Sequence, residues 1–178
     1  MNARLFLGIT LPPSLCKQLA NLPELPAHCK PTAPHNYHLT LAFIGEVDRD
    51  LIDIIHPAMA DINAFDFPLA VRGLGRFDHR ILWAGLTSHS HLHDLHQRIL
   101  SALDAAHIPF DFKPYKPHIT LARLRNSVDK EAVEAYITAN ADLQSSSFMV
   151  EQFHLYESVS TAHGVQYTPI ASYELKHI

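Results

Sequence analysis

Features that mark several large protein classes are scarce in this sequence of 178 residues. It has two cysteines, Cys16 and Cys29, and neither lies in a CxxC pair, so we expect no disulfide framework and a reducing, cytoplasmic environment. No apolar run reaches the ~18 residues that a membrane-spanning helix needs. Glycine is also sparse. Gly73-Leu74-Gly75 lacks the third glycine of a dinucleotide-binding turn, and no phosphate-binding loop is present, so ATP hydrolysis is not indicated.

Basic charge is not in surplus either. Lys and Arg number 14, and Asp and Glu number 18, which gives a formal net charge of −4. A protein that coats long nucleic acids needs a basic surplus to neutralise many phosphates, so that class is excluded. An enzyme that binds one phosphate at the end of a strand remains compatible with this charge. The chain is 47% hydrophobic, which is enough for a sizeable core.

Turn residues and hydrophobic periodicity divide the chain into strands and helices. The apolar start, Leu5–Leu11, runs into Pro12-Pro13 and not into a cleavage site, so it is predicted to be a buried strand and not a signal peptide. Further strands are predicted at Tyr37–Ile44, at Phe67–Leu74 paired with Ile81–Leu86, and at His118–Leu124, Phe148–Tyr156 and Val165–Leu175, with a short extended piece at Pro109–Phe112. Helices are predicted at Ser14–Leu22, from an Asp48 cap to about Ala64, from a Ser88 or Ser90 cap to Ala106, and at Asp129–Ala139.

One five-residue segment occurs twice. The segment that begins at His38, His-Leu-Thr-Leu-Ala, recurs 80 residues later from His118 as His-Ile-Thr-Leu-Ala. Each copy is preceded by a predicted strand and helix and is followed by a helix and two more strands. The simplest architecture is two copies of one unit that face each other, with antiparallel strands and with helices on the outside.

The duplicated segment carries a pattern suited to phosphodiester chemistry. Side chains alternate along a strand, so His38 and Thr40 share one face, as do His118 and Thr120. Facing copies would therefore line one groove with two imidazoles and two hydroxyls. An imidazole pKa of about 6.5 lets one ring take a proton from water while the other, protonated, gives one to the leaving oxygen. The hydroxyls can bind the non-bridging oxygens. Because the imidazolium and any nearby arginine supply the positive charge, neither a metal nor another cofactor is expected.

Nearly the whole chain resembles the two-histidine (2H) phosphoesterase superfamily, and within it the RNA 2′,3′-cyclic phosphodiesterases, historically called 2′-5′ RNA ligases. The resemblance is carried by both His-x-Thr-x tetrapeptides and by the segments Arg4–Ile9, Asn36–Val47, Arg80–Gly85, Lys116–Arg123, Phe153–Ser158 and Tyr167–Pro169. It implies an α+β fold with two antiparallel sheets that line a central cleft. The implied organisation is one domain, 1–178, of two interleaved lobes that each contribute one His-x-Thr-x strand.

The resemblance also implies an activity and the roles of its residues. The implied reaction is hydrolysis of an RNA terminal 2′,3′-cyclic phosphate to a 2′-phosphomonoester, with a reverse ATP-independent 2′-5′ ligation. By family role His38 is the proton donor and His118 the acceptor, although the nearly symmetric motifs do not themselves assign these roles. The implied partners are RNA 3′ ends with a 2′,3′-cyclic phosphate, such as tRNA fragments. No membrane partner is implied, and we expect a monomer.

Three further residues are candidates for substrate binding. Arg123 matches the family's phosphate-binding arginine. It lies five residues after His118, so an ideal strand would point it away, and this role requires a bulge or the end of the strand; a solvated surface arginine is the alternative. Tyr115 either stacks on a terminal base or belongs to the core or rim, and Phe43 leaves the same alternatives open.

Other functions compete with this interpretation. The same histidines would serve a phosphodiesterase acting on 2′-5′-linked oligonucleotides or on small nucleotide cyclic phosphates, and an RNA-end binding protein without turnover is a further alternative. A metal-handling protein is suggested by the histidine-rich segment His89–His96, in which His89, His93 and His96 could share a helix face. A zinc site would need a cysteine or carboxylate partner, so a solvated helix start is favoured. Seven of the 14 basic side chains are Arg72, Arg76, Arg80, Lys113, Lys116, Arg123 and Arg125. Several of them could flank the cleft and steer an RNA end towards it, and a scattered, solvated surface is the alternative.

Overall fold

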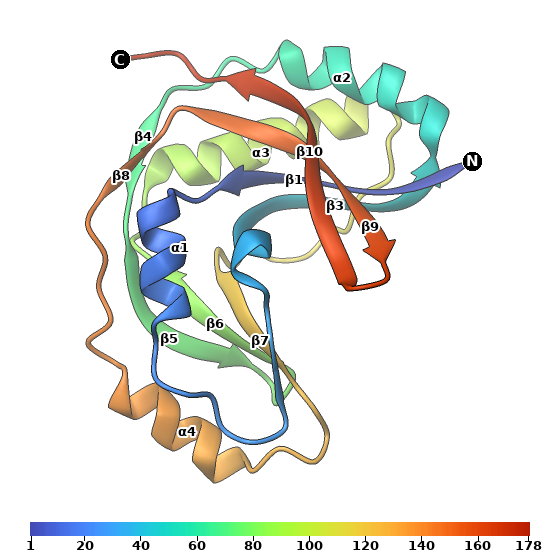
Figure 1. Ribbon diagram of the computed structural model, residues 1–178. Helices are drawn as coiled ribbons and strands as arrows, with labels where there is room; N and C mark the ends of the chain where they lie inside the picture. Colours follow the sequence, from blue (N-terminus) through green and yellow to red (C-terminus); the bar gives the residue numbers. More distant parts are fainter.

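The computed structural model describes all 178 residues as a mixed α+β fold (Figure 1). Four helices, α1 to α4, span Pro13–Ala20, Ile52–Ala60, Ser90–Ala105 and Lys130–Ala139. Ten strands, β1 to β10, span Asn2–Thr10, Cys29–Pro31, His38–Asp48, Phe67–Leu69, Val71–Phe77, Ile81–Leu86, Ile119–Leu124, Phe148–Val150, Gln152–Thr161 and Gly164–Glu174. None of the helices is long and apolar enough to cross a membrane.

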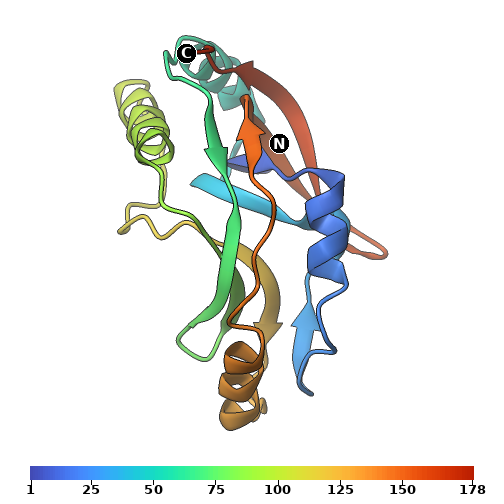
Figure 2. The ribbon, with the colours of Figure 1, turned by 90° about the vertical axis from the view of Figure 1, so that its left-hand side faces the viewer.

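The strands form two four-stranded antiparallel sheets and one short ladder. The first sheet has the order β10-β9-β1-β3, and the second has the order β2-β7-β6-β5. The short strands β4 and β8 pair with each other and connect the two sheets along one side of the molecule (Figure 2). The predicted antiparallel, two-sheet architecture is therefore confirmed.

Each sheet combines strands from both sequence repeats. The first repeat runs through β1, α1, β3, α2 and β5, and the second runs through β6, α3, β7, α4 and β9. Strands β1 and β3 nevertheless pair with β9, while β6 and β7 pair with β5. The first helix of each repeat is exchanged in the same way: α1 of the first repeat packs on the second sheet, and α3 of the second repeat packs on the first sheet. The repeats are thus intertwined.

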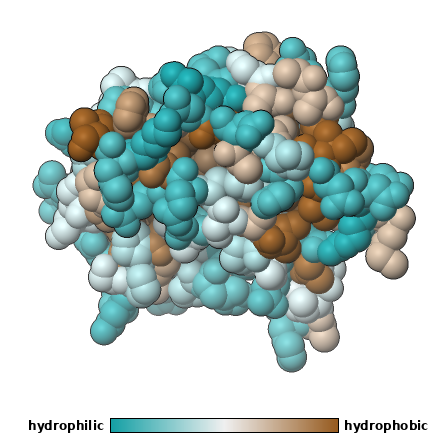
Figure 3. Space-filling model, turned by 90° about the horizontal axis from the view of Figure 1, so that it is seen from above, coloured by the Kyte–Doolittle hydropathy of each residue, from teal (hydrophilic) through white to brown (hydrophobic).

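Apolar side chains cover the helix-facing side of each sheet. The largest core joins the first sheet to α2 and α3, with Leu5, Leu39 and Leu41 fully buried beside Ile55 and Leu95. Two smaller cores attach α1 and α4 to the second sheet. The surface seen from above, over α2 and the C-terminus, is mostly hydrophilic, with its hydrophobic side chains in separate patches (Figure 3).

Matching bulges interrupt the two strands that carry the repeated segment. In β3 the pairing with β1 passes from Thr40 to Ala42, so that Leu41 is the extra residue. In β7 the pairing with β6 passes from Thr120 to Ala122, so that Leu121 is the extra residue. A bulge of one residue reverses the alternation of side chains beyond it.

Four sequence predictions are corrected by the structure. The strand predicted at Phe67–Leu74 is two strands, since β4 leaves β6 and pairs with β8. The second helix ends at Ala60 and does not reach Ala64, which with Asp66 forms backbone hydrogen bonds to Lys176. The third helix is capped by His89, whose ring accepts from the amide of His91, and not by Ser88 or Ser90. The strand predicted at Phe148–Tyr156 is also two strands, since β8 ends at Val150 and pairs with β4, whereas β9 begins at Gln152 and pairs with β1.

Candidate active site

The two repeated histidines come from different sheets that meet at one seam. His38 opens β3 at the edge of the first sheet, and His118 directly precedes β7 in the second. Strands β3 and β7 are in contact. In both strands the aliphatic neighbours are buried, whereas the histidine and threonine are half-buried on the opposite face. We call this face of each sheet its site face.

A local hydrogen bond fixes each imidazole. The Nδ1 atom of His38 lies 2.8 Å from the carbonyl oxygen of Asn36, and Nδ1 of His118 lies 2.7 Å from that of Lys116. A carbonyl oxygen can only accept, so Nδ1 carries a hydrogen in both rings and Nε2 is left for chemistry. Nε2 of His38 lies 2.9 Å from Oγ1 of Thr40, whereas Nε2 of His118 has no partner within the chain.

The surroundings shift both histidines towards the neutral form. Burial lowers the pKa of His38, the bond to the Asn36 carbonyl opposes this, and the nearby charge of His118 lowers it further. Burial also lowers the pKa of His118, against the opposing bond to the Lys116 carbonyl.

Aromatic rings support both imidazoles from equivalent places in the two sheets. His38 packs against Phe6, with ring centroids 4.8 Å apart, and against the edge of Tyr167 at 5.0 Å. His118 meets Phe77 edge-on at 4.7 Å. Phe77 and Tyr156 occupy equivalent positions, and Tyr156 also lies beside His38, at 6.0 Å. Each imidazole is therefore packed against an aromatic side chain of its own sheet.

The bulges settle the direction of two predicted site residues. Beyond Leu121, Ala122 is buried and Arg123 is exposed, so Arg123 returns to the site face with Thr120. The bulge that its family role requires is thus present. Phe43 holds the equivalent place in β3, and the guanidinium of Arg4 lies 4.8 Å from its ring centroid.

Tyr115 packs beneath β3. Its ring stacks on the imidazole of His96 at 3.8 Å, and its hydroxyl donates a 3.0 Å bond to the carbonyl of Thr40. Nδ1 of His96 in turn bonds the neighbouring carbonyl, that of Leu41, at 2.7 Å. Of the two alternatives that the sequence leaves open for Tyr115, these contacts are those of a core residue.

Asn36 is a site residue that sequence reasoning missed. Its side chain is buried; Nδ2 donates to the carbonyl of Val165 at 2.7 Å, and Oδ1 accepts from the amide of Tyr167 at 3.1 Å. These bonds tie β10 to the turn before His38 and hold Tyr167 against the imidazole. A polar residue two positions before His38 was the only sequence signal.

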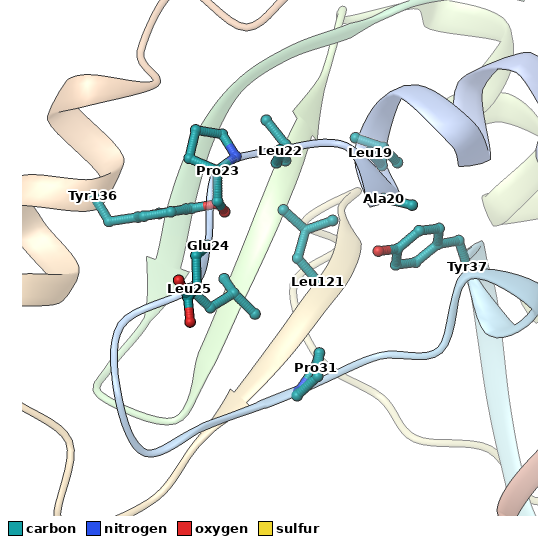
Figure 4. A pocket seen from close by; sticks show the side chains of 10 residues that line it. All are labelled: Leu19, Ala20, Leu22, Pro23, Glu24, Leu25, Pro31, Tyr37, Leu121 and Tyr136. Carbon is teal, nitrogen blue, oxygen red and sulfur yellow. The ribbon is translucent and has the colours of Figure 1, made fainter.

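A pocket lies on the other face of the second sheet. It has a volume of about 180 Å³ and is lined by the end of α1 and the segment that follows it, by Pro31 and Tyr37, by Leu121 of β7 and by Tyr136 of α4 (Figure 4). Leu121 points into it, while its neighbour Thr120 points to the site face. This pocket is therefore separated from the histidines by the sheet itself.

The family model described as the 2′-5′ RNA ligase superfamily matches residues 11–162. This chain belongs to that superfamily. The match includes both repeated strands and therefore both histidines.

Two relatives in this superfamily are similar over nearly the full chain. The RNA 2′,3′-cyclic phosphodiesterase of Aeropyrum pernix is 30% identical over 89% of this chain and 94% of its own length. The Escherichia coli protein of the same name is 29% identical over 97% of this chain and 96% of its own. The crystal structure of E. coli LigT complexed with 3′-AMP superimposes with a TM-score of 0.82 and 26% identity over 99% of both chains.

The structure gives the members of the histidine-rich segment different roles. His89 caps α3 and stacks on Phe67, and His93 is exposed. The prediction of a solvated helix start is wrong for His96, which is 6% exposed because its ring is sandwiched against Tyr115 under β3. No group of three or more His, Cys, Asp or Glu side chains is arranged to hold a metal.

Proposed function

We propose that this protein hydrolyses the terminal 2′,3′-cyclic phosphate of RNA to a 2′-phosphomonoester. The observation that carries the proposal is the pair of imidazoles on adjoining strands, each with Nδ1 fixed by a carbonyl and Nε2 left for proton transfer. Membership of the superfamily supports it, as do relatives named RNA 2′,3′-cyclic phosphodiesterase and the 3′-AMP complex of the E. coli protein.

In the proposed mechanism the two histidines act on opposite sides of the phosphorus. Nε2 of His118, which has no partner in the chain, takes a proton from water as the water oxygen attacks the phosphorus. The bond from phosphorus to the 3′ oxygen breaks, and protonated His38 gives its proton to that oxygen. The products are a 2′-phosphate and a free 3′ hydroxyl. Ligation through a 2′-5′ linkage is the same displacement with a 5′ hydroxyl in place of water as the nucleophile, and the 3′ oxygen again leaves.

Other side chains on the site faces stabilise the charge that develops on the phosphate. Thr40 and Thr120 donate hydrogen bonds to the non-bridging oxygens, and the Arg123 guanidinium adds positive charge. Phe43 offers its ring to the terminal base, on the side away from Arg4. Because protein groups supply both the proton transfer and the charge, the proposed reaction needs no metal or other cofactor.

The test is product analysis on an oligoribonucleotide that ends in a 2′,3′-cyclic phosphate, in the presence of a chelator. We expect a 2′-phosphate product from the metal-stripped protein. His38→Ala and His118→Ala should each lower the rate by roughly 10²–10⁴, which is the usual worth of a positioned general acid or base. His163→Ala is the matched control, because His163 is exposed in the β9–β10 turn.

Three other outcomes of this test would contradict part of the proposal. Hydrolysis of 2′-5′-linked oligonucleotides or of small nucleotide cyclic phosphates, with the RNA end untouched, would replace the proposed substrate. Binding of the RNA end without turnover would make the protein a binding module. Activity that vanishes in chelator and returns with zinc would contradict the metal-free mechanism.

We further propose that the chain acts as a single domain of two interleaved lobes, as a monomer, in the cytoplasm. Both histidines come from one chain, and Cys16 and Cys29 are free thiols, as expected in a reducing compartment. RNA fragments with cyclic phosphate ends, including those of tRNA, are the proposed substrates. Light scattering on the active fraction tests the monomer.

A further inference from the structure

Two cations face each other across the edge of the second sheet. Lys30 in β2 is the direct antiparallel partner of Arg123 in β7. The neighbours of Lys30 point to the helix side, where Cys29 packs against the α4 core and Pro31 lines the pocket with Leu121 (Figure 4). By alternation Lys30 therefore lies on the site face with Arg123.

No acidic side chain neutralises this pair. Neither Lys30 nor Arg123 takes part in any of the five ion pairs or in a side-chain hydrogen bond. Arg80 and Arg125 are also exposed and free of ion pairs, and the backbone places them at the same end of the sheet, since the amide of Leu124 bonds the carbonyl of Arg80. Like charges directly opposite each other on neighbouring strands are destabilising. A bound polyanion would offset that repulsion.

The position of the pair fits a phosphate next to the reacting one. Arg123 is the next residue after Thr120 on the site face of β7, beyond the bulge at Leu121 and on the side away from His118. Lys30 lies one strand farther out, on the edge strand β2. The equivalent place in the first sheet carries the aromatic ring of Phe43, with Arg4 over it. The two sheets therefore differ at this position, and the second sheet offers a path of unpaired cations away from the histidines.

We propose that Lys30 binds the phosphate on the 5′ side of the terminal nucleotide, beside the Arg123 guanidinium that faces the reacting phosphate. Lys30 thereby selects RNA chains over mononucleoside cyclic phosphates, which have no such phosphate. This inference rests on the proposed function and names the substrate feature that the site reads.

The test compares Lys30→Gln with Lys130→Gln. Lys130→Gln removes the same charge from the exposed start of α4, which packs on the opposite side of the second sheet, so it serves as the control. For each variant, kcat/KM is measured on a short oligoribonucleotide with a 2′,3′-cyclic phosphate and on a mononucleoside 2′,3′-cyclic phosphate, over a range of salt. We expect Lys30→Gln to lower the ratio of the two kcat/KM values about tenfold and to reduce the salt slope on the oligonucleotide by about 0.7, the value for one phosphate contact on a single strand. Lys130→Gln should keep the wild-type ratio and slope.

The outcomes separate this inference from the proposed function. An unchanged ratio in Lys30→Gln, or an equal fall in Lys130→Gln, would overturn the role of Lys30 while leaving the hydrolysis intact. Absence of turnover on both substrates would overturn the proposed function instead. The role of Lys30 is then tested by fluorescence anisotropy, which measures the affinity for an oligoribonucleotide that ends in a 2′-phosphate. Equal affinities of the two variants would refute the role. A lower affinity of Lys30→Gln alone would support it.

Discussion

The hydroxyl of Tyr115 donates a 3.0 Å hydrogen bond to the backbone carbonyl of Thr40, between the two core-facing leucines of the first motif. His96 binds the next carbonyl, that of Leu41, and stacks on the same tyrosine. Leu41 is the extra residue of the bulge that follows Thr40 in β3. Two side chains from outside the first sheet thus fix the part of the strand that aims Thr40.

Removal of this hydroxyl should therefore impair both stability and rate. We expect Tyr115→Phe to cost about 1 kcal/mol of unfolding free energy, because a carbonyl loses its partner. Misplacement of Thr40 should lower kcat up to about tenfold, with a smaller change in KM. Denaturant unfolding and steady-state kinetics measure both effects. Tyr37→Phe is the control, since the Tyr37 hydroxyl has no partner in the chain and lines the pocket on the other face; equal losses in the two variants would contradict this positioning role.

The pH dependence follows from the lowered pKa values of the two histidines. His118 as the base must be neutral, so kcat/KM is lost as pH falls through its pKa. His38 as the acid must be protonated, so kcat/KM is lost as pH rises through its pKa. Burial puts both values below 6.5 in the free protein, and the bell-shaped profile should therefore peak below pH 6.5. A maximum above neutral pH on a mononucleoside cyclic phosphate would contradict the directions of these shifts.

Valine and serine variants should separate the contribution of each threonine hydroxyl to the rate from that of the threonine's branched shape. Thr40→Val and Thr120→Val keep the branched shape but remove a donor to the phosphate, and each should lower kcat by about 10²-fold. Thr40→Ser and Thr120→Ser keep the hydroxyl and should recover most of that loss. Serine variants as slow as the valine variants would show that the methyl groups, and not the hydroxyls, are required.

Gly75 makes room for the single tryptophan of the chain, Trp83. A Cβ atom at Gly75 would lie 2.2 Å from the indole ring, and Phe77, which contacts His118, packs against the same indole. We expect Gly75→Ala to displace Trp83, to destabilise the fold by about 1–3 kcal/mol and to slow the reaction. Tryptophan fluorescence reports the displacement. Combining Gly75→Ala with Trp83→Phe should restore part of the stability, and the absence of any such recovery would rule out a clash with the indole.

The sequence predicts the chemistry of this protein more fully than its topology. Alternation in the duplicated segment predicts which face carries His38 and His118, because a period of two is a local property. The family role of Arg123 even requires a bulge, which the structure places at Leu121. Pairing partners are not local, so nothing in β5 or β9 indicated that each would join the sheet of the other repeat. The burial of His96 was missed for the same reason, since Tyr115 covers it from 19 residues farther along the chain.

The exchange of β5 and β9 between the sheets has a consequence for the ancestry and folding of the molecule. A chain with a single repeat would pair only two strands, the equivalents of β1 and β3. Its last strand, the equivalent of β5, would have no partner, so the strand edges would be left without hydrogen-bond partners. Such a chain could close both sheets only by trading that strand with a second copy of itself, as a swapped homodimer does. The present molecule corresponds to that dimer with its two subunits fused, so we expect its sheets to melt in one cooperative transition and neither half to refold when expressed alone.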